Sequence, residues 1–361
     1  MGYLKKTLTA FFNRIILSRK KLIGREGLES YDSLLDIKRE EIRLSLKNSN
    51  IPSTYQQEFL QSFLIEKGGV FSIPNARIYG RIGLIKLGSK LLIENHLNKY
   101  YYLNKSGDTK YLLKFWENPR VNSGTHLILS ASVSDNYFMW MMYFVPLIQL
   151  VVSADIQPKH VTVWLRNKAP AFQYESLAHF GFAAIKELDG SALEFERLII
   201  PTFRYLDVEK SAIGHYNVLS RNAILWMNKT YDQEVLRDRI VIISRSKTNR
   251  RRLVNENEIH QILGGDIVHL EEMTFDEQVR LFNQAKVVIS PHGAGLTNLI
   301  FGKNIKVFEF YPDTRTLNNP KNLQICDYLD HTYHLFIQPS INEKQDMNVD
   351  LETIKYIQRH V

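Results

Sequence analysis

Short runs of apolar residues, separated by polar and glycine-rich turns, fill the second half of the chain. Residues 127–129, 161–165 and 240–243 are rich in branched side chains and lack polar alternation, as is typical of strands buried on both faces of a parallel sheet. Residues 172–180 have a helical pattern that ends at Gly181, where a C-terminal glycine is expected. This alternation predicts an α/β fold in which helices cover both faces of parallel sheets.

The first half has a different pattern. Residues 1–25 combine basic side chains with apolar residues near helical spacing, which predicts a basic amphipathic helix. Such a helix lies on an anionic membrane surface or packs on its own domain with solvated lysines, and its apolar runs are too short to span a membrane. Residues 31–64 predict further helix without identifiable chemistry. From residue 69, short apolar runs predict strands, with glycines at positions 80, 83 and 88 in hairpins or bulges.

Length and charge narrow the class of protein. A chain of 361 residues is long enough for two or three domains. The net charge of +8 favours an anionic partner, for which nucleic acid, anionic lipid and nucleotide sugars all qualify. Cys326 is the single cysteine, so an intrachain disulfide is excluded and a reducing compartment such as the cytoplasm is expected.

A glycine turn near the C-terminal end carries the first chemical signal. The buried run at residues 287–289 is followed by Ser-Pro-His-Gly-Ala-Gly at residues 290–295 and by a helix expected to open at Leu296. A strand, a glycine turn and a helix start place several backbone N–H groups at one point, which favours a phosphate or diphosphate. The alternative is a turn that serves close packing alone.

A basic loop follows the run at residues 240–243. In open α/β sheets ligands bind beyond the carboxyl ends of the strands, so this loop and the glycine turn are expected to face one crevice. Guanidinium groups bind phosphate oxygens in a bidentate manner. The alternative is a solvated loop. Its basic residues are Arg245, Lys247, Arg250, Arg251 and Arg252.

The order of these motifs resembles glycosyltransferase family 61 over residues 225–335. The matching residues are Ser244-Arg245, Arg251 before Asn255-Glu256, Phe275 with Gln278 and Ala285, the run His292 to Asn298, and Glu309 with Pro312. The resemblance implies an inverting, metal-independent enzyme of GT-B architecture that uses a nucleotide sugar, with uridine as the expected base. It further implies hexosyl or pentosyl transfer to a glycan or lipid-linked glycan in surface or capsular polysaccharide synthesis.

These expectations define a domain plan with two facing doubly wound, Rossmann-like domains and a short β-rich lead-in. Residues 1–68 are expected to form a helical region. Residues 69–225 comprise the lead-in and an N-terminal, acceptor-binding domain. Residues 226–361 form the C-terminal domain that binds the nucleotide sugar. No cofactor is expected, and peripheral contact with the inner face of the membrane through residues 1–25 remains a hypothesis.

Roles follow for individual residues. The donor site is expected to use Arg245, Arg251 and Gly293, Ala294, Gly295, Leu296, Thr297 and Asn298, chiefly through side-chain cations and backbone amides. Glu309 is expected to accept hydrogen bonds from ribose hydroxyls, with a structural ion pair as the alternative. His292 is expected to contact the leaving phosphate or the sugar, or to be a satisfied loop histidine. No Asp-x-Asp dyad stands at a strand end, so no metal ligand is predicted.

The helix after residues 127–129 carries the acceptor-side hypothesis. Asp135 is the expected catalytic base that takes the proton of the acceptor hydroxyl, and the alternative is a helix cap formed by Asp135 or its neighbours. Pro146 is expected to kink or divide this helix. Where the resembled family has a histidine and an acidic residue, this chain has Met139 and Tyr143. This departure keeps open a catalytically reduced scaffold protein in glycan assembly. Nucleic-acid binding through the basic loop is a third, weaker interpretation.

Overall fold

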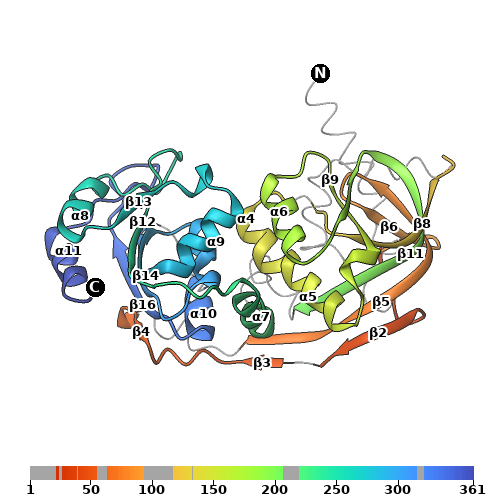
Figure 1. Ribbon diagram of the computed structural model, residues 1–361, viewed down its shortest axis with the longest axis horizontal. Coiled ribbons are helices and arrows are strands. Elements are labelled where there is room, and N and C mark those ends of the chain that lie inside the picture. Colours follow the sequence, from red (N-terminus) through yellow and green to blue (C-terminus); the bar gives the residue numbers. More distant parts are fainter. Residues whose placement is uncertain are drawn as a thin grey trace, which may run out of the picture. The chain divides into compact units, whose positions relative to one another are not determined.

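The computed structural model divides the chain into two compact units (Figure 1). Unit 1 comprises residues 1–40 and 65–215, and unit 2 comprises residues 41–64 and 216–361. The predicted helix over residues 1–25 lies outside the described part except for Leu22–Ile23, which form strand β1. The structure describes residues 22–23, 27–38, 40–54, 63–92, 117–131, 133–205, 219–314 and 321–361.

Unit 2 is built on a parallel sheet in the order β13-β12-β14-β15-β16-β4. Because β12 and β14 are neighbours but not consecutive in the chain, the strand order reverses between them. In open α/β sheets this reversal point is where ligands bind. The strands are β4 (Ser49–Asn50), β12 (Arg239–Ile243), β13 (Asp266–Val268), β14 (Ala285–Pro291), β15 (Lys306–Pro312) and β16 (Thr332–Gln338).

Helices cover both faces of this sheet (Figure 1), as the alternating pattern predicts. On one face, Ile242 and Phe308 of the sheet pack with Ile259 of α8 and Ile354 of α11. The other face carries α7, α9, α10 and the 3₁₀ helix η8. The helical elements are α7 (Arg221–Tyr231), α8 (Glu256–Leu263), η7 (Leu270–Glu272), α9 (Phe275–Gln284), η8 (Ala294–Phe301), α10 (Lys321–Tyr328) and α11 (Leu351–Gln358).

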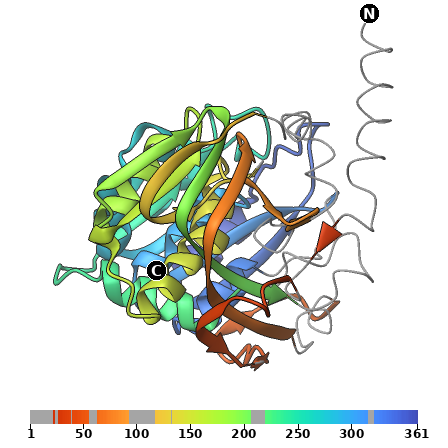
Figure 2. The ribbon, with the colours of Figure 1, turned by 90° about the vertical axis from the view of Figure 1, so that its right-hand side faces the viewer.

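Unit 1 contains a mixed sheet (Figure 2), in which strands from residues 63–92 join strands from residues 120–205. β11, β8, β9 and β10 are parallel neighbours, and β11 pairs antiparallel with β5. The predicted parallel strands are therefore one part of a mixed sheet. The remaining strands are β2 (Asp32–Ile37), β3 (Glu40–Ile42), β5 (Phe63–Gly80), β6 (Leu84–Leu87), β7 (Lys90–Leu92), β8 (Arg120–Ile128), β9 (Val161–Arg166), β10 (Ala184–Leu188) and β11 (Gly190–Tyr205).

Pro146 divides the helix after β8, as predicted. α4 (Tyr137–Met139) runs into a π-helical segment, η4 (Trp140–Phe144), and then into α5 (Val145–Ser153). The Val145 N–H donates to the Trp140 carbonyl, five residues back, so the backbone is wider just before a residue that has no N–H to donate. Two further elements are η5 (Pro158–His160) and α6 (Ala171–His179), and Gly181 follows α6 with φ of 82°.

Two predictions about the first half are wrong. The described part of residues 31–64 is largely extended, and β2 pairs antiparallel with β5. Its few apolar side chains suit the partly buried edge of a sheet, and strand pairing overrides the weak helical pattern. Residues 70–73 and 76–79 belong to the single strand β5, which β11 pairs on both sides of Pro74. The expected turns after β5 and β6 are confirmed, with Gly83 and Gly88 at positive φ.

Candidate functional site

The basic loop and the glycine turn meet at the carboxyl ends of β12 and β14, which are adjacent strands. The Arg245 guanidinium lies against Gly293, since a Cβ added there would be 2.4 Å from Arg245 Nη1. Arg251 Nη1 donates to the carbonyl oxygen of His292 at 2.8 Å. Two arginines from one loop therefore lie at the turn formed by the other loop, within one unit of the molecule.

Glycine is needed at the two positions of the turn for different physical reasons. Gly293 is extended, with φ of −177°, so its conformation suits any residue and only the nearby Arg245 excludes a side chain. A Cβ at Gly295 would instead meet Leu270 Cδ1 at 2.7 Å and Ile243 Cγ2 at 3.4 Å. Gly293 thus permits close approach of a cation, and Gly295 permits close packing against the end of β12 and against η7.

Backbone amides line the start of η8. The N–H groups of Gly293, Ala294 and Gly295 donate to no acceptor among the described residues, whereas the Leu296 N–H donates to the Gly293 carbonyl at 3.3 Å. Unsatisfied amides at a helix start favour an anion. The predicted helix is a 3₁₀ helix that begins at Ala294, two residues earlier than expected. The amides of residues 293–295 and the two arginines form what we call the anion cradle.

The rest of the predicted donor motif points into the protein. The side chains of Leu296, Thr297 and Asn298 are fully buried. Asn298 Nδ2 donates to Gln278 Oε1 at 2.7 Å, and Gln278 in turn donates to the Leu270 carbonyl at 3.0 Å. These side chains fix η8 against α9 and the loop after β13. They support the cradle from within, which differs from the expectation of direct donor contact.

The basic loop is held in a strained and bonded conformation. Arg251 has φ of 59°, a left-handed conformation that is uncommon for a residue with a Cβ, and its N–H donates to the Lys344 carbonyl at 2.9 Å. Arg252 forms an ion pair with the buried Asp346, and hydrogen bonds from Arg252 lower the pKa of that carboxyl to about 2. Arg252 is therefore an anchor of the loop rather than a solvated side chain.

Other charged groups brace the same loop. Lys247 forms an ion pair with Glu272 after β13, and Ser244 Oγ donates to Glu256 Oε1 at 2.9 Å. Asn255 is the residue before α8, and its amide donates to the Val349 carbonyl at 2.8 Å. Glu256 is the first residue of α8, so these two residues brace the start of the helix.

His292, which directly follows β14, and Glu309, in the middle of β15, form a pair. His292 Nδ1 lies 2.5 Å from Glu309 Oε1, and its ring packs on Tyr311 with centroids 4.5 Å apart. Asn322 Nδ2 donates to Glu309 Oε1 at 2.9 Å, and the Tyr333 hydroxyl donates to Oε2 at 2.6 Å. Glu309 was expected to accept from ribose hydroxyls. Its side chain is 2% exposed and both oxygens already accept from protein donors.

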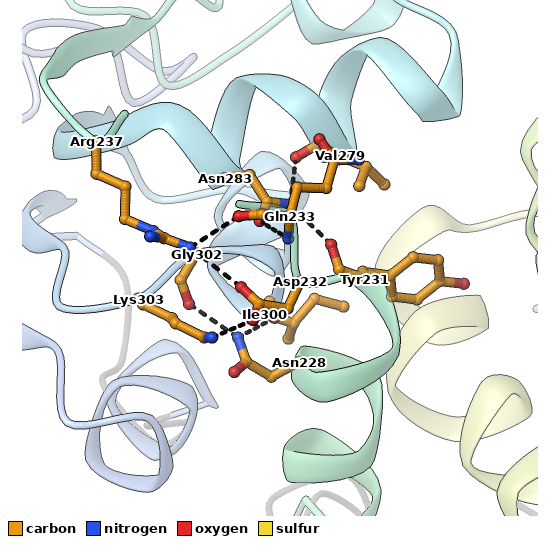
Figure 3. Close-up of polar contacts among 10 residues, drawn as sticks. All are labelled: Asn228, Tyr231, Asp232, Gln233, Arg237, Val279, Asn283, Ile300, Gly302 and Lys303. Atoms are coloured by element: carbon orange, nitrogen blue, oxygen red, sulfur yellow. Dashed lines mark hydrogen bonds and ion pairs between the residues drawn. The ribbon is translucent and has the colours of Figure 1, made fainter. Parts of the chain in front are cut away.

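A second polar network supports the far end of η8 (Figure 3). Asn228 Nδ2 donates to the carbonyls of Ile300 and Gly302, both at 2.8 Å. Asn283, at the centre of the view, donates to the carbonyls of Tyr231 and Val279. The half-buried Asn228 amide therefore fixes the end of η8 to α7, and Asn283 links α9 to α7, so the helix that carries the cradle amides is held in place.

Asp135 lies in unit 1, in the turn between β8 and α4. Its Oδ2 accepts a hydrogen bond from Arg166 Nη1 at 2.7 Å, at the carboxyl end of the neighbouring strand β9, and both side chains are about half exposed. Asn136 is the residue that caps α4, since its side chain accepts from the Met139 N–H at 3.1 Å. Met139 is half-buried and Tyr143 is buried.

His126 is a satisfied core histidine. Nε2 lies 3.1 Å from the Ser123 carbonyl, Nδ1 accepts from Trp164 Nε1 at 3.2 Å, and the ring stacks on Phe195. Burial lowers the pKa of His126, which favours the neutral ring. His215 lies outside the described residues. Within the described ranges, no group of three or more His, Cys, Asp or Glu side chains has the geometry of a metal site.

Three neighbours of the His292–Glu309 pair were not predicted: Asn322 and Tyr333 donate to Glu309, and Tyr311 packs on the His292 ring. They come from α10, β16 and β15, and each stands in an ordinary amphipathic or apolar stretch. The motif around His292 and Glu309 is readable in the sequence, but the residues that contact it depend on the order of strands in the sheet. No sequence signal identifies them.

Comparison with known proteins adds one match. No curated protein matches the chain. The family model described as Glycosyltransferase 61 matches residues 135–314, which span Asp135, both arginines of the cradle, the glycine turn and Glu309. The match therefore covers the strands and loops that form the anion cradle. Through these residues, the chain belongs to glycosyltransferase family 61.

Proposed function

We propose that this glycosyltransferase transfers a sugar, a hexose or a pentose, from a nucleotide-sugar donor to a glycan acceptor with inversion, in surface or capsular polysaccharide synthesis. UDP is the proposed leaving group. The observation that supports this most is the anion cradle, in which Arg245 and Arg251 lie at the turn that carries three adjacent amides. We further propose a GT-B arrangement in which unit 2 holds the donor and unit 1 the acceptor.

The cradle suits the charge that develops during transfer. As the bond between the anomeric carbon and the diphosphate oxygen breaks, negative charge moves onto the diphosphate. Guanidinium groups and fixed N–H donors stabilise that charge without reorganisation. We therefore propose a metal-independent reaction in which Arg245, Arg251 and the amides of residues 293–295 stabilise the leaving group, and His292 donates to it.

Inversion requires a base on the opposite face of the sugar. Asp135 is the proposed base, taking the proton of the acceptor hydroxyl as its oxygen bonds to the anomeric carbon. Its place beyond the carboxyl ends of β8 and β9 supports this assignment, and its ion pair with Arg166 orients one carboxylate oxygen. Asp135→Asn is expected to abolish transfer while leaving UDP binding intact.

A thermal-shift panel of nucleoside diphosphates and nucleotide sugars tests the donor site, because a ligand that binds the native state raises the melting temperature. UDP and UDP-sugars are expected to raise it, and Arg245→Ala and Arg251→Ala are expected to remove the shift. Arg250→Ala is the matched control, since Arg250 is an exposed arginine of the same loop. A panel without any shift would refute the donor site, and equal shifts in all three variants would refute the role of the arginines.

A second candidate function is a catalytically reduced scaffold in glycan assembly. Met139 and the buried Tyr143 stand where the resembled family has a histidine and an acidic residue, and neither is an acid or base near neutral pH. Slow hydrolysis of a bound UDP-sugar without acceptor would favour the enzyme. Binding without hydrolysis, at every pH between 5 and 9, would favour the scaffold.

The proposed setting is the cytoplasm, with peripheral contact at the inner face of the membrane through residues 1–25. No helix within the described ranges is long and apolar enough to cross a bilayer. Basic residues near an anionic surface each contribute about 1 kcal/mol of attraction. Replacement of Arg19, Lys20 and Lys21 by Gln is expected to reduce cosedimentation with anionic vesicles. Equal cosedimentation would place the contact elsewhere.

A further inference from the structure

Three hydrogen-bond donors from three elements converge on the carboxylate of Glu309. His292 follows β14, Asn322 belongs to α10 and Tyr333 belongs to β16. The carboxylate is 2% exposed, so these donors take the place of water. A buried carboxylate is costly unless its oxygens are satisfied, and here both are. The arrangement fixes the orientation of the one donor that lies at the anion cradle, His292.

The surroundings are consistent with a negative charge at Glu309. The pKa of Tyr333 is raised, first by burial and then by the Glu309 carboxylate. The pKa of the Cys326 thiol in α10 is also raised, again first by burial and then by Glu309. Both shifts favour the neutral forms of these neighbours. The three donors that converge on the two oxygens of Glu309 are the partners that a buried carboxylate anion requires. Its partner His292 is the group whose protonated form that anion stabilises.

We propose that Glu309 is a positioning residue that holds His292 with its proton on Nδ1 and stabilises the imidazolium, so that Nε2–H donates to the leaving diphosphate. This inference rests on the proposed function of the site. A carboxylate accepts hydrogen bonds and donates none, so the contact at 2.5 Å requires the proton on Nδ1. Nε2, on the other side of the ring, is then the atom assigned to substrate.

The His292–Glu309 pair has charged and titratable neighbours on several elements. Arg251, from the loop after β12, donates to the His292 carbonyl and adds a positive charge that disfavours the imidazolium. Tyr311 of β15 packs on the imidazole ring. Tyr333 and Cys326 lie on the Glu309 side and have raised pKa values. Glu309 is therefore the group in this set that favours the charged imidazole.

The kinetic test compares Glu309→Gln with Tyr333→Phe on hydrolysis of the UDP-sugar that gives the largest thermal shift. In Glu309→Gln, kcat is expected to fall roughly 10²- to 10⁴-fold, and the alkaline limb of its pH profile is expected to move toward acid, because the imidazolium loses its carboxylate partner. Tyr333→Phe removes one donor but keeps the carboxylate, so the alkaline limb of its pH profile should stay near that of the wild-type enzyme. Equal pH profiles in the two variants would overturn the proposal, because a purely structural role predicts that both behave alike.

A second measurement does not depend on activity. Nitrogen-15 NMR of histidine-labelled wild-type protein, with His292→Gln to assign the signal, reports which ring nitrogen carries the proton. Protonation of Nδ1 near neutral pH is expected, and a proton on Nε2 alone would overturn the proposal even if the enzyme is active. If no UDP-sugar binds, the donor site fails, whereas the NMR result still decides the role of Glu309.

Discussion

Gly293→Ala is expected to disrupt the anion cradle while leaving the fold intact. The alanine Cβ would lie 2.4 Å from Arg245 Nη1, which is closer than real contacts allow. The backbone at this position is extended, so alanine causes no strain there, and the displaced atom is the end of a flexible side chain. The variant is therefore expected to fold with nearly wild-type stability and to hold the Arg245 guanidinium away from the turn.

The expected loss is in donor affinity. A hydrogen bond to a charged group contributes about 1.5–3 kcal/mol, which corresponds to a roughly 10- to 150-fold weaker Kd for UDP. Isothermal titration calorimetry with UDP measures the change, and thermal unfolding checks the fold. Gly295→Ala is the contrasting variant: it meets buried Leu270 and Ile243, and overpacking costs about 1–3 kcal/mol of unfolding free energy. Wild-type UDP affinity in Gly293→Ala would refute the assignment of Arg245 to the diphosphate.

Three further predictions concern stability, each measured by denaturant unfolding. Asp346 has a pKa of about 2 in the native state against 3.8 unperturbed. Its pairing with Arg252 therefore stabilises the fold fully above pH 3.8, and this stabilisation is lost as the pH falls toward 2. Asp346→Asn should lower the free energy of unfolding at neutral pH and remove this dependence on pH. Burial lowers the pKa of His331 from 6.5 to about 4, so between these pH values only the unfolded chain gains a proton, and stability decreases as the pH is lowered from 6.5 toward 4. An unchanged slope in His331→Gln would contradict this. Asn283→Ala removes the donor to the Tyr231 carbonyl and the acceptor of the Gln233 N–H, and should cost about 1–3 kcal/mol. A wild-type midpoint would show that water replaces the amide.

Several features were predictable because they depend on local sequence. Consecutive branched residues predicted the buried strands β9, β12 and β14, and Gly181 marked the end of α6. Strand propensity and turn chemistry act over a few residues, so a single sequence contains them. The meeting of Arg245 with Gly293 also followed from sequence, since carboxyl ends of parallel strands share one edge of a sheet.

The prediction of helix over residues 31–64 was wrong because pairing with a distant strand, β5, determines the conformation of this segment. β2 is a strand since it pairs with β5, and its own apolar spacing is too irregular to show a two-residue period. β10 was missed for a similar reason, as its residues are mostly exposed and its parallel neighbour β9 fixes its conformation. Edge strands depend on partners far away in the chain, and local pattern gives little information about them.

The roles within the site were decided by tertiary structure. The sequence marked His292 and Glu309 as candidate site residues, but the adjacency of β14, β15 and β16 directs the carboxylate to the imidazole and to Tyr333. Likewise, the sequence marked Arg252 as basic, and only the fold brings the buried Asp346 to it. Local sequence determines which residues can carry charge and where strands end, whereas long-range packing determines which of those charges are satisfied by protein and which face a ligand.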